Sequence, residues 1–510
     1  MKISFLQTES YRKGLFYSSG FNVLAKILAF SQSLVIAYYF GTKSETDVFF
    51  YCLSSVGLIS IYFGSLNHTV LIPEAMRIRV QESNEQAIIF LNFFLYLYSF
   101  ISMVLTLILL ANPIKIFSIL SNFNENTLNI SKELVFYSIP LLMLMNLTSY
   151  LTDILTSYKY FTIPMIAAMV NSLFVLLFIF LFHNSLSILS ILWGLIFGYM
   201  LNIVLLTILL KRMGWAFKFK FIKINLRIKK NIFYAQLGNI TTTVGSFLPL
   251  FLISGFNSGI IAALNYGQKI STIPDQFFTT QMSQVIAIKF NELSAKKDYS
   301  TLNKTFFESL STLVFILIPI SLVLFFFPAI IVKVLYQRGQ FDQNSVKITS
   351  EFLKYFGLLL PFLAINTIIS RLFTASQKVR INFFSQIVMI IIFIPTLYFL
   401  LKIMGPIGYP VAVLCYLCIS ILLISIFLIK KNFPFINLMA ISHLFVKILF
   451  INIFIIAPFF VLAKYFEINS MVFVLFIVYY ISILFFLNYK YAFCLQINEL
   501  QKKYFFNTNR

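Results

Sequence analysis

Residues 163–210 read IPMIAAMVNSLFVLLFIFLFHNSLSILSILWGLIFGYMLNIVLLTILL, a run without Asp, Glu, Lys or Arg. A helix of about 20 apolar residues crosses the hydrocarbon core of a bilayer, because its backbone amides are paired within the helix. The run is long enough for two such helices, with the polar residues near Asn184 between them. It predicts that this part of the chain lies in a membrane.

Apolar stretches of similar length follow one another along the chain. The fourteen predicted spans are residues 16–40, 48–72, 87–111, 134–157, 163–183, 186–210, 231–254, 261–287, 307–332, 352–373, 381–401, 407–429, 442–463 and 468–489. Hydrophobic residues are 60% of the 510 residues and charged residues 11%, a composition that excludes a soluble globular protein. The sequence therefore predicts an all-α integral membrane protein with about 14 transmembrane helices.

The net charge of +22 is spread unevenly over the predicted loops. If the N-terminus is cytoplasmic, 26 basic residues lie in segments on the cytoplasmic side and 8 in loops on the outer side. This is the positive-inside distribution, and it predicts that both termini are cytoplasmic. It also assigns the excess charge to the headgroups of membrane lipids and not to a nucleic acid.

The sequence repeats its own pattern. The sixth span closes with Leu210-Lys211-Arg212 and the twelfth, 219 residues later, with Ile429-Lys430-Lys431. Two sets of six spans in the same orientation are typical of transporters, which bind substrate near the interface between the halves. The predicted domains are an N-terminal six-helix lobe (residues 1–220), a C-terminal six-helix lobe (221–435) and two additional transmembrane helices with a cytoplasmic tail (436–510).

Polar residues recur at helical spacing in two of the spans. In the eighth span they are Asn265, Lys269, Thr272 and Gln276, which share one helix face, and in the first span they are Asn22 and Lys26, one turn apart. Polar groups are costly against lipid, so we expect both sets to face the protein interior or a water-filled cavity. The alternative is that the lysines snorkel, since each lies about 10–14 Å from a helix end.

Acidic residues and a histidine provide candidates for ion coupling. Asp47 follows a predicted loop, where capping of the second span is the commoner role. Asp275 follows Pro274, where a broken helix would free backbone carbonyls, and Asp153 is expected to pair with a neighbouring helix. His68 would titrate near neutral pH, although a lone histidine among apolar residues more often serves packing.

The sequence contains few signals for other chemistry. It has no Gly-rich phosphate loop, which argues against an ATPase, and Cys415 and Cys418 lie in an apolar span without a partner pair for zinc. We therefore predict no metal and no cofactor. The two longest predicted outer loops, at about residues 112–133 and 333–351, lack closely spaced carboxylates and histidine, so a membrane enzyme is less favoured than a transporter.

Three segments resemble one family. Residues 39–50, YFGTKSETDVFF, resemble the "FG…TDAFF" segment of the MurJ/MviN lipid II flippases, in the multidrug/oligosaccharidyl-lipid/polysaccharide exporter superfamily. Residues 335–341, LYQRGQF, are similar to an outer loop of that family, and Lys269 stands where it has an arginine shortly before a proline. The likeness covers residues from about 20 to 430, and the 14-helix topology extends it to the end of the chain.

The resemblance implies a central cavity between two lobes that opens alternately to each side of the membrane. In such a cavity Lys26 and Lys269 would hold the diphosphate of the substrate, whereas Gln32 stands where the family usually has a second arginine, and residues 58–62 lack its arginine pair. The implied substrate is a polyprenyl-diphosphate-linked glycan, either lipid II or a surface-polysaccharide repeat unit.

The implied activity is translocation of this glycan to the outer leaflet of the bacterial cytoplasmic membrane. We expect a monomer that is driven by the membrane potential, H⁺ or Na⁺. The alternatives are a cation-coupled multidrug exporter of the same superfamily and, less favoured, an enzyme acting on lipid-linked glycans. Basic residues outnumber acidic ones in the presumed cavity helices, which favours an anionic headgroup over a cationic drug.

Overall fold

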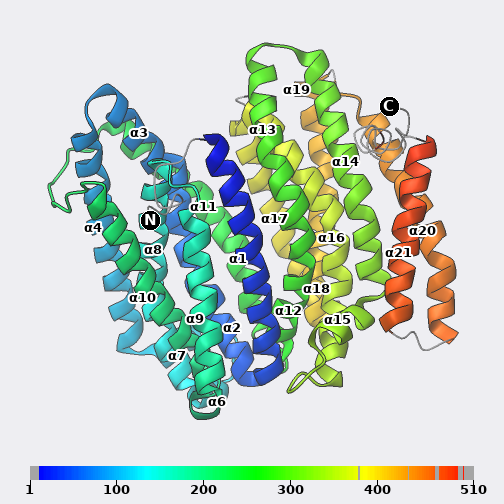
Figure 1. The fold of residues 1–510 in the computed structure, drawn as a ribbon, viewed down its shortest axis with the longest axis horizontal. Coiled ribbons are helices and arrows are strands. Elements are labelled where there is room, and N and C mark those ends of the chain that lie inside the picture. The colour runs from blue at the N-terminus through cyan, green and yellow to red at the C-terminus, as the bar shows by residue number, and fades with distance from the viewer. Residues whose placement is uncertain (1–10, 377–378, 435, 466–469, 492–497, 499–510) are drawn as a thin grey trace. The chain divides into compact units, whose positions relative to one another are not determined.

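The computed structural model describes residues 11–376, 379–434, 436–465, 470–491 and 498. The regular elements in these ranges are all helices (Figure 1). They belong to two compact units: unit 1 is Met1–Ala262 with Arg338–Asp342, and unit 2 is Ala263–Gln337 with Gln343–Arg510. The all-α class predicted from the apolar spans is confirmed.

Unit 1 contains the first seven predicted spans. Its helices are α1 (Tyr11–Phe40), α2 (Ser44–Leu66), the π-helical turn η2 (Asn67–Leu71), α3 (Ile72–Gln81), α4 (Asn84–Ala111), α5 (Pro113–Leu120), α6 (Glu125–Ile130), α7 (Lys132–Ser138), α8 (Pro140–Ser157), α9 (Ile163–Leu186), α10 (Leu189–Arg212) and α11 (Leu226–Ile253). The second span is longer than predicted, because α2 continues through η2 into α3.

Glycines set the close packing of α10 on α9. A Cβ atom on Gly194 would lie 2.7 Å from Val175 Cα, and one on Gly198 would lie 2.9 Å from Asn171 Oδ1. Small residues allow membrane helices to approach closely, as here. One turn further along α10, Asn202 Nδ2 donates a hydrogen bond to Asn171 Oδ1 (2.8 Å), so the polar groups of this interface are paired.

Unit 2 begins within α12 (Ile260–Pro274), which starts in unit 1. Its further elements are the π-helical turn η3 (Asp275–Thr279), α13 (Thr280–Ala295), α14 (Tyr299–Phe326), α15 (Pro328–Tyr336), α16 (Gln343–Ala375), α17 (Val379–Met404), the short turn η4 (Gly405–Ile407), α18 (Gly408–Leu423), η5 (Ile424–Ile429), α19 (Lys430–Asn432), α20 (Leu438–Tyr465) and α21 (Ser470–Tyr491). A hydrogen bond connects α20 and α21: the hydroxyl of Tyr480 in α21 donates to Asn452 Oδ1 in α20 (2.5 Å).

Among the described residues, each of the fourteen predicted spans is largely helical. Twelve helical segments of the described residues are long and apolar enough to cross a membrane. One of them, Phe384–Leu423, contains both α17 and α18, which turn back on each other at Gly405 (φ +63°). The eighth predicted span forms α12, η3 and α13, and it is absent from the twelve because its polar residues lower the mean hydropathy.

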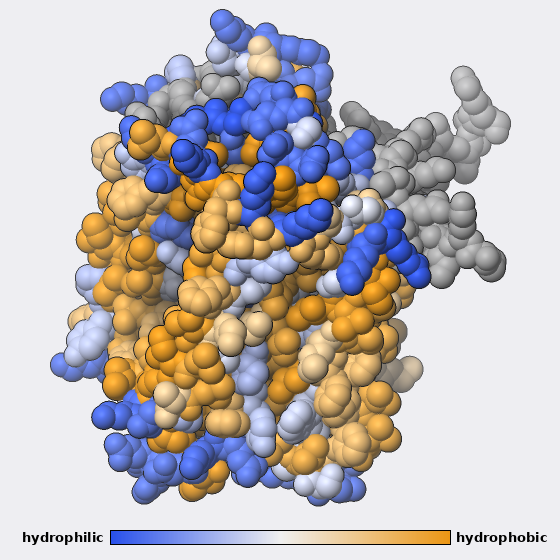
Figure 2. Space-filling model, turned by 90° about the vertical axis from the view of Figure 1, so that its left-hand side faces the viewer, coloured by the Kyte–Doolittle hydropathy of each residue, from blue (hydrophilic) through white to orange (hydrophobic). Residues whose placement is uncertain are grey.

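The surface agrees with a membrane environment. Figure 2 shows one face of the molecule, on which an apolar band lies between two polar ends. Large apolar side chains are exposed on several helices; on α4 they include Phe100, Met103, Leu107 and Ile108. A continuous exposed apolar surface of this kind is stable in lipid and not in water.

The division into compact units differs from the division into predicted lobes. Helix α11 packs on α2 and belongs to unit 1, so the units divide after Ala262 and not at residue 220. The predicted lobes (1–220 and 221–435) and the addition (436–510) describe an internal repeat, which compactness does not test. They stay a prediction.

Candidate functional site

The predicted polar stripe lies on the accessible side of α12. Lys269 and Gln276 are exposed, and Asn265 and Thr272 are half-buried. The opposite side packs within unit 2: Tyr266 is fully buried against the ring of Tyr336, with ring centroids 5.2 Å apart. The Thr272 hydroxyl donates to the carbonyl oxygen of Lys269 (3.0 Å), which leaves the Lys269 ammonium as the charged group of this face.

Close packing holds α12 in this orientation. A Cβ on Gly267 would lie 3.1 Å from Leu353 N and 3.2 Å from Thr349 O of α16. A larger residue at this position would therefore push α12 away from α16. Gly267 is two residues before Lys269, so this contact fixes the direction in which the lysine side chain leaves the helix.

Lys26 and Asn22 lie on α1. Both are half-buried, and the intervening Ala25 is buried. Helix α1 packs along α9 within unit 1. Lys26 belongs to unit 1 and Lys269 to unit 2, so the diphosphate site predicted from the two lysines stays a prediction.

Asp47 caps a helix that is distant in sequence. Its carboxylate accepts hydrogen bonds from the backbone amides of Gly259 (2.5 Å) and Ala262 (2.7 Å), and the side chain is 2% exposed. These amides are free donors at the start of α12. The expected cap on the second span is therefore wrong: in the described structure the residue before α2, Lys43, makes no side-chain cap, and Asp47 caps α12.

The loop between α1 and α2 fits closely against two other segments of unit 1. Gln340 N donates to Tyr38 O (2.8 Å), and Lys43 Nζ donates to Gln340 Oε1 (3.0 Å). Gly41 has φ +59°, and a Cβ there would lie 2.4 Å from Gln340 O. Gly259 has φ +89°, and a Cβ there would lie 2.7 Å from the carbonyl oxygen of the loop residue Thr42. Glycine is required at both positions by conformation and by space.

A polar cavity of about 340 Å³ lies beside this loop. The ring of Tyr39 contacts the ring of His183 of α9 at a tilt of 42°, with centroids 4.2 Å apart, and Lys43 and Glu45 contribute opposite charges to the wall. The sequence-based search did not single out His183, because it stands at the end of an apolar span far from Tyr39 in the chain.

The remaining candidates for ion coupling lie in the π-helical turns η2 and η3. His68 is in η2, and its Nε2 lies 3.4 Å from Asp153 Oδ1 of α8. Asp153 also accepts a hydrogen bond from Asn67 Nδ2 (2.9 Å), so its predicted pairing with a neighbouring helix is confirmed. Asp275 is half-buried in η3. The helix break expected after Pro274 is wrong: the chain continues as a π-helical turn into α13.

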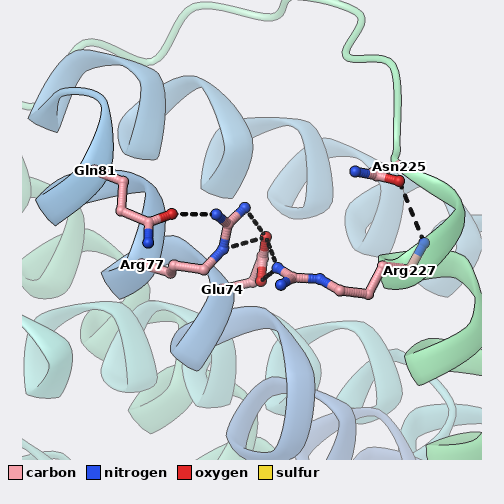
Figure 3. A network of polar contacts seen from close by, with 5 residues as sticks. All are labelled: Glu74, Arg77, Gln81, Asn225 and Arg227. Atoms are coloured by element: carbon pink, nitrogen blue, oxygen red, sulfur yellow. Dashed lines mark hydrogen bonds and ion pairs between the residues drawn. The ribbon is translucent and has the colours of Figure 1, made fainter.

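The sequence alone did not identify Glu74 of α3 as a candidate residue. Figure 3 shows it between two arginines: it accepts from Arg77 Nε (3.0 Å) and, with both carboxylate oxygens, from Arg227 Nη2 (3.0 and 2.9 Å). Arg77 also bonds Gln81, and Asn225 caps the first turn of α11 through Arg227 N (3.3 Å). The network joins the first turn of α3 to the start of α11.

Charged side chains deep in membrane helices are expensive and are kept mainly where solutes or ions pass. The helices and their polar groups therefore define a membrane transport protein. The chain belongs to the lipid II flippase MurJ family, whose profile, described as "Lipid II flippase MurJ", matches residues 36–484.

Curated relatives agree over most of the chain. It is 25% identical over 382 residues to a protein of Aquifex aeolicus named "Probable lipid II flippase MurJ", with 73% of each chain covered. It is 27% identical over 349 residues to a protein of the same name from Borreliella burgdorferi, covering 66% of this chain and 67% of the relative.

Solved structures share the fold. A "Lipid II flippase MurJ, inward closed conformation" matches with a TM-score of 0.79 and 21% identity over 94% of this chain and 98% of that one. An inward-facing multidrug resistance MATE family transporter of the MOP superfamily matches with a TM-score of 0.65 and 12% identity, over 80% and 96% of the two chains. This chain therefore shares its helical fold with both structures.

Proposed function

We propose that this chain translocates lipid II, a polyprenyl-diphosphate-linked glycan, from the inner to the outer leaflet of the bacterial cytoplasmic membrane. Membership of the lipid II flippase family supports the proposal, and so does the name of its relatives. The observation that carries it is the exposed side chain of Lys269, about 12 Å inside a predicted span. Such a charge needs an anion or water beside it.

The diphosphate is the part of the substrate that a cation can recognise. Two unit charges about 4 Å apart attract each other by about 4 kcal/mol at an effective dielectric constant near 20. Asn265, Thr272 and Gln276 add hydrogen-bonding groups along the same helix face, suited to a glycan. The polyprenyl tail stays in the lipid, and no bond of the substrate is made or broken.

The proposed orientation places both termini in the cytoplasm, as the 26-to-8 distribution of basic residues favours. In a variant without the native cysteines, single cysteines at Ser44, Asn257 and Asn344 should react with a membrane-impermeant thiol reagent in intact cells. A cysteine at Asn225 should react only after the cells are opened. Asn225, Asn257 and Asn344 are exposed, so protection would not result from burial. Labelling of Asn225 alone in intact cells would reverse the orientation.

Complementation tests the function directly. We expect the chain to restore growth to bacterial cells depleted of their own lipid II flippase, and we expect membranes of those cells to accumulate lipid II on the outer leaflet in unaltered chemical form. A variant with Lys269→Ala serves as the control for transport through this site. Failure to restore growth in spite of normal insertion would contradict lipid II as the substrate. A chemically altered lipid-linked glycan would instead favour an enzyme.

A further inference from the structure

A carboxylate, an imidazole and an amide meet inside unit 1, away from Lys26 and Lys269. Asp153 Oδ1 lies 3.4 Å from His68 Nε2, and Asp153 Oδ2 accepts from Asn67 Nδ2 at 2.9 Å. The Asp153 side chain is 10% exposed, whereas that of His68 is 69% exposed. The pair therefore has an inner, enclosed acid and an outer, accessible base.

This site lies nearer the end than the start of the long helix formed by α2, η2 and α3, because His68 is 24 residues after Ser44, a rise of about 36 Å. His68 is thirteen residues before Gln81, the end of α3, a rise of about 20 Å at 1.5 Å per residue. It also stands in the π-helical turn η2, where the regular hydrogen-bonding pattern of the helix is interrupted. Such turns are frequent at functional sites.

Polar groups continue from the pair along the interface of α4 and α8. Asn146 Nδ2 donates to Ser102 Oγ (2.9 Å), and Asn146 precedes Asp153 by seven residues on the same face of α8. On α4 the polar side chains Tyr98, Ser102 and Thr106 recur every four residues. A continuous line of polar side chains thus runs along two apolar helices.

Several atoms on this line are buried without a partner. Within the described part of the chain, Asn67 Oδ1, Tyr98 OH, Asn146 Oδ1 and Thr106 Oγ1 have no hydrogen-bond partner. Asn67 and Tyr98 are 1% and 4% exposed. Buried polar atoms are almost always satisfied, so these mark places for water or for a transferred proton. The Asn67 atom belongs to the same amide that binds Asp153.

Few other charges face the pair. Tyr98 of α4 and Tyr150 of α8 are the titratable neighbours of Asp153, and the Tyr150 hydroxyl donates to Leu91 O (3.0 Å). Tyr62 of α2 is adjacent to Tyr98. From α3, Arg79 is engaged one turn beyond Asp153, where it donates to Ser157 O (3.2 Å).

The other helices that pack on α8 and η2 carry their charges at their ends. Residues 163–182 of α9 and 189–210 of α10 contain no Asp, Glu, Lys, Arg or His, and the two basic residues that end α10, Lys211 and Arg212, are exposed. Helix α7 carries Lys132 and Glu133 in its first turn, toward the far end of α8 from Asp153. Helix α11 places Asn239 beside α2, where it accepts from Ser65 (2.7 Å), and its basic residues lie in its first two turns, where Arg227 binds Glu74. His68 is therefore the cation available to Asp153.

We propose that Asp153 and His68 form a proton-binding site whose occupancy is coupled to substrate translocation, an inference that rests on the proposed function. A proton on His68 completes an ion pair with the enclosed carboxylate. When His68 loses this proton, the Asp153 carboxylate keeps only its hydrogen bond from the Asn67 amide. The contacts that hold η2 change as a result. Protons entering from the outer side would then drive the outward movement of the substrate.

The first experiment uses the purified full chain in liposomes that contain lipid II, with the membrane potential clamped to zero. A gradient of one pH unit, acidic on the side that receives the substrate, should raise the initial rate of translocation by up to about tenfold. Asp153→Asn and His68→Gln should translocate at a rate that the gradient does not change. His443→Gln, an exposed histidine of α20, is the matched control and should respond like the wild type. Equal responses in all variants, or stimulation by a sodium gradient alone, would overturn the proposal.

A second measurement needs no substrate. In histidine-labelled protein, Asp153→Asn should change the pH dependence of the imidazole signal of His68 if the two side chains share a proton site. His443→Gln should leave that pH dependence unchanged. If the wild type translocates no lipid II under any condition, the proposed function fails while this titration still reports on the site. An unchanged His68 titration in Asp153→Asn would rule out the proton site itself.

Discussion

Lys269→Ala is expected to abolish translocation of lipid II while the amount of protein in the membrane stays normal. The variant removes the one charged group on the exposed face of α12, and a diphosphate there would lose an attraction of about 4 kcal/mol. That corresponds to a decrease of roughly three orders of magnitude in rate if the interaction is made mainly in the rate-limiting step. The measurement is the rate of lipid II transfer in liposomes.

Two variants sharpen this test. Lys269→Arg should retain much of the activity, because a guanidinium can bind phosphate with two parallel hydrogen bonds. Lys289→Ala removes another exposed lysine, from α13, and should leave transport unchanged. Normal transport by Lys269→Ala and by the Lys26→Ala/Lys269→Ala double variant would show that both lysines only snorkel to a membrane surface.

The spans were predictable because they depend on a local property. An apolar stretch of sufficient length must form a helix in lipid, and the described helices follow all fourteen stretches. The polar stripe around Lys269 was found for the same reason, since helical periodicity alone places its members on one face. Even there, the sequence did not reveal that Pro274 leads into a π-helical turn, because one proline is compatible with a kink, a break or a bulge.

Partners distant in the chain were not predictable. Asp47 follows a loop, which by local rules favours capping of its own helix, yet its acceptors are satisfied by the amides at the start of α12. Arg227 is one of the basic residues whose excess charge the sequence assigns to lipid headgroups, but it binds Glu74. A pattern of charges shows how much charge a segment carries, whereas the tertiary fold decides which charges meet.

Asp47→Ala should be strongly destabilising, with a lower midpoint of thermal unfolding and reduced transport. It leaves the amides of Gly259 and Ala262 buried without their acceptor, and each unsatisfied donor costs about 1–3 kcal/mol. Asp47→Asn keeps one of the two acceptor oxygens, so its unfolding midpoint should fall between those of Asp47→Ala and the wild type. Glu45→Ala changes an exposed acid of the same loop and should behave as the wild type.

The effect on transport follows from the position of the cap. Ile260, the first residue of α12, is nine residues before Lys269, a distance of about 14 Å along the helix. A frayed first turn would therefore loosen the segment that presents the lysine, and Asp47→Ala should slow translocation even at temperatures where the protein remains folded. If Asp47→Ala unfolds at the wild-type midpoint, its hydrogen bonds to α12 contribute nothing to stability. If its midpoint falls but the folded protein transports at the wild-type rate, the cap stabilises α12 without positioning Lys269.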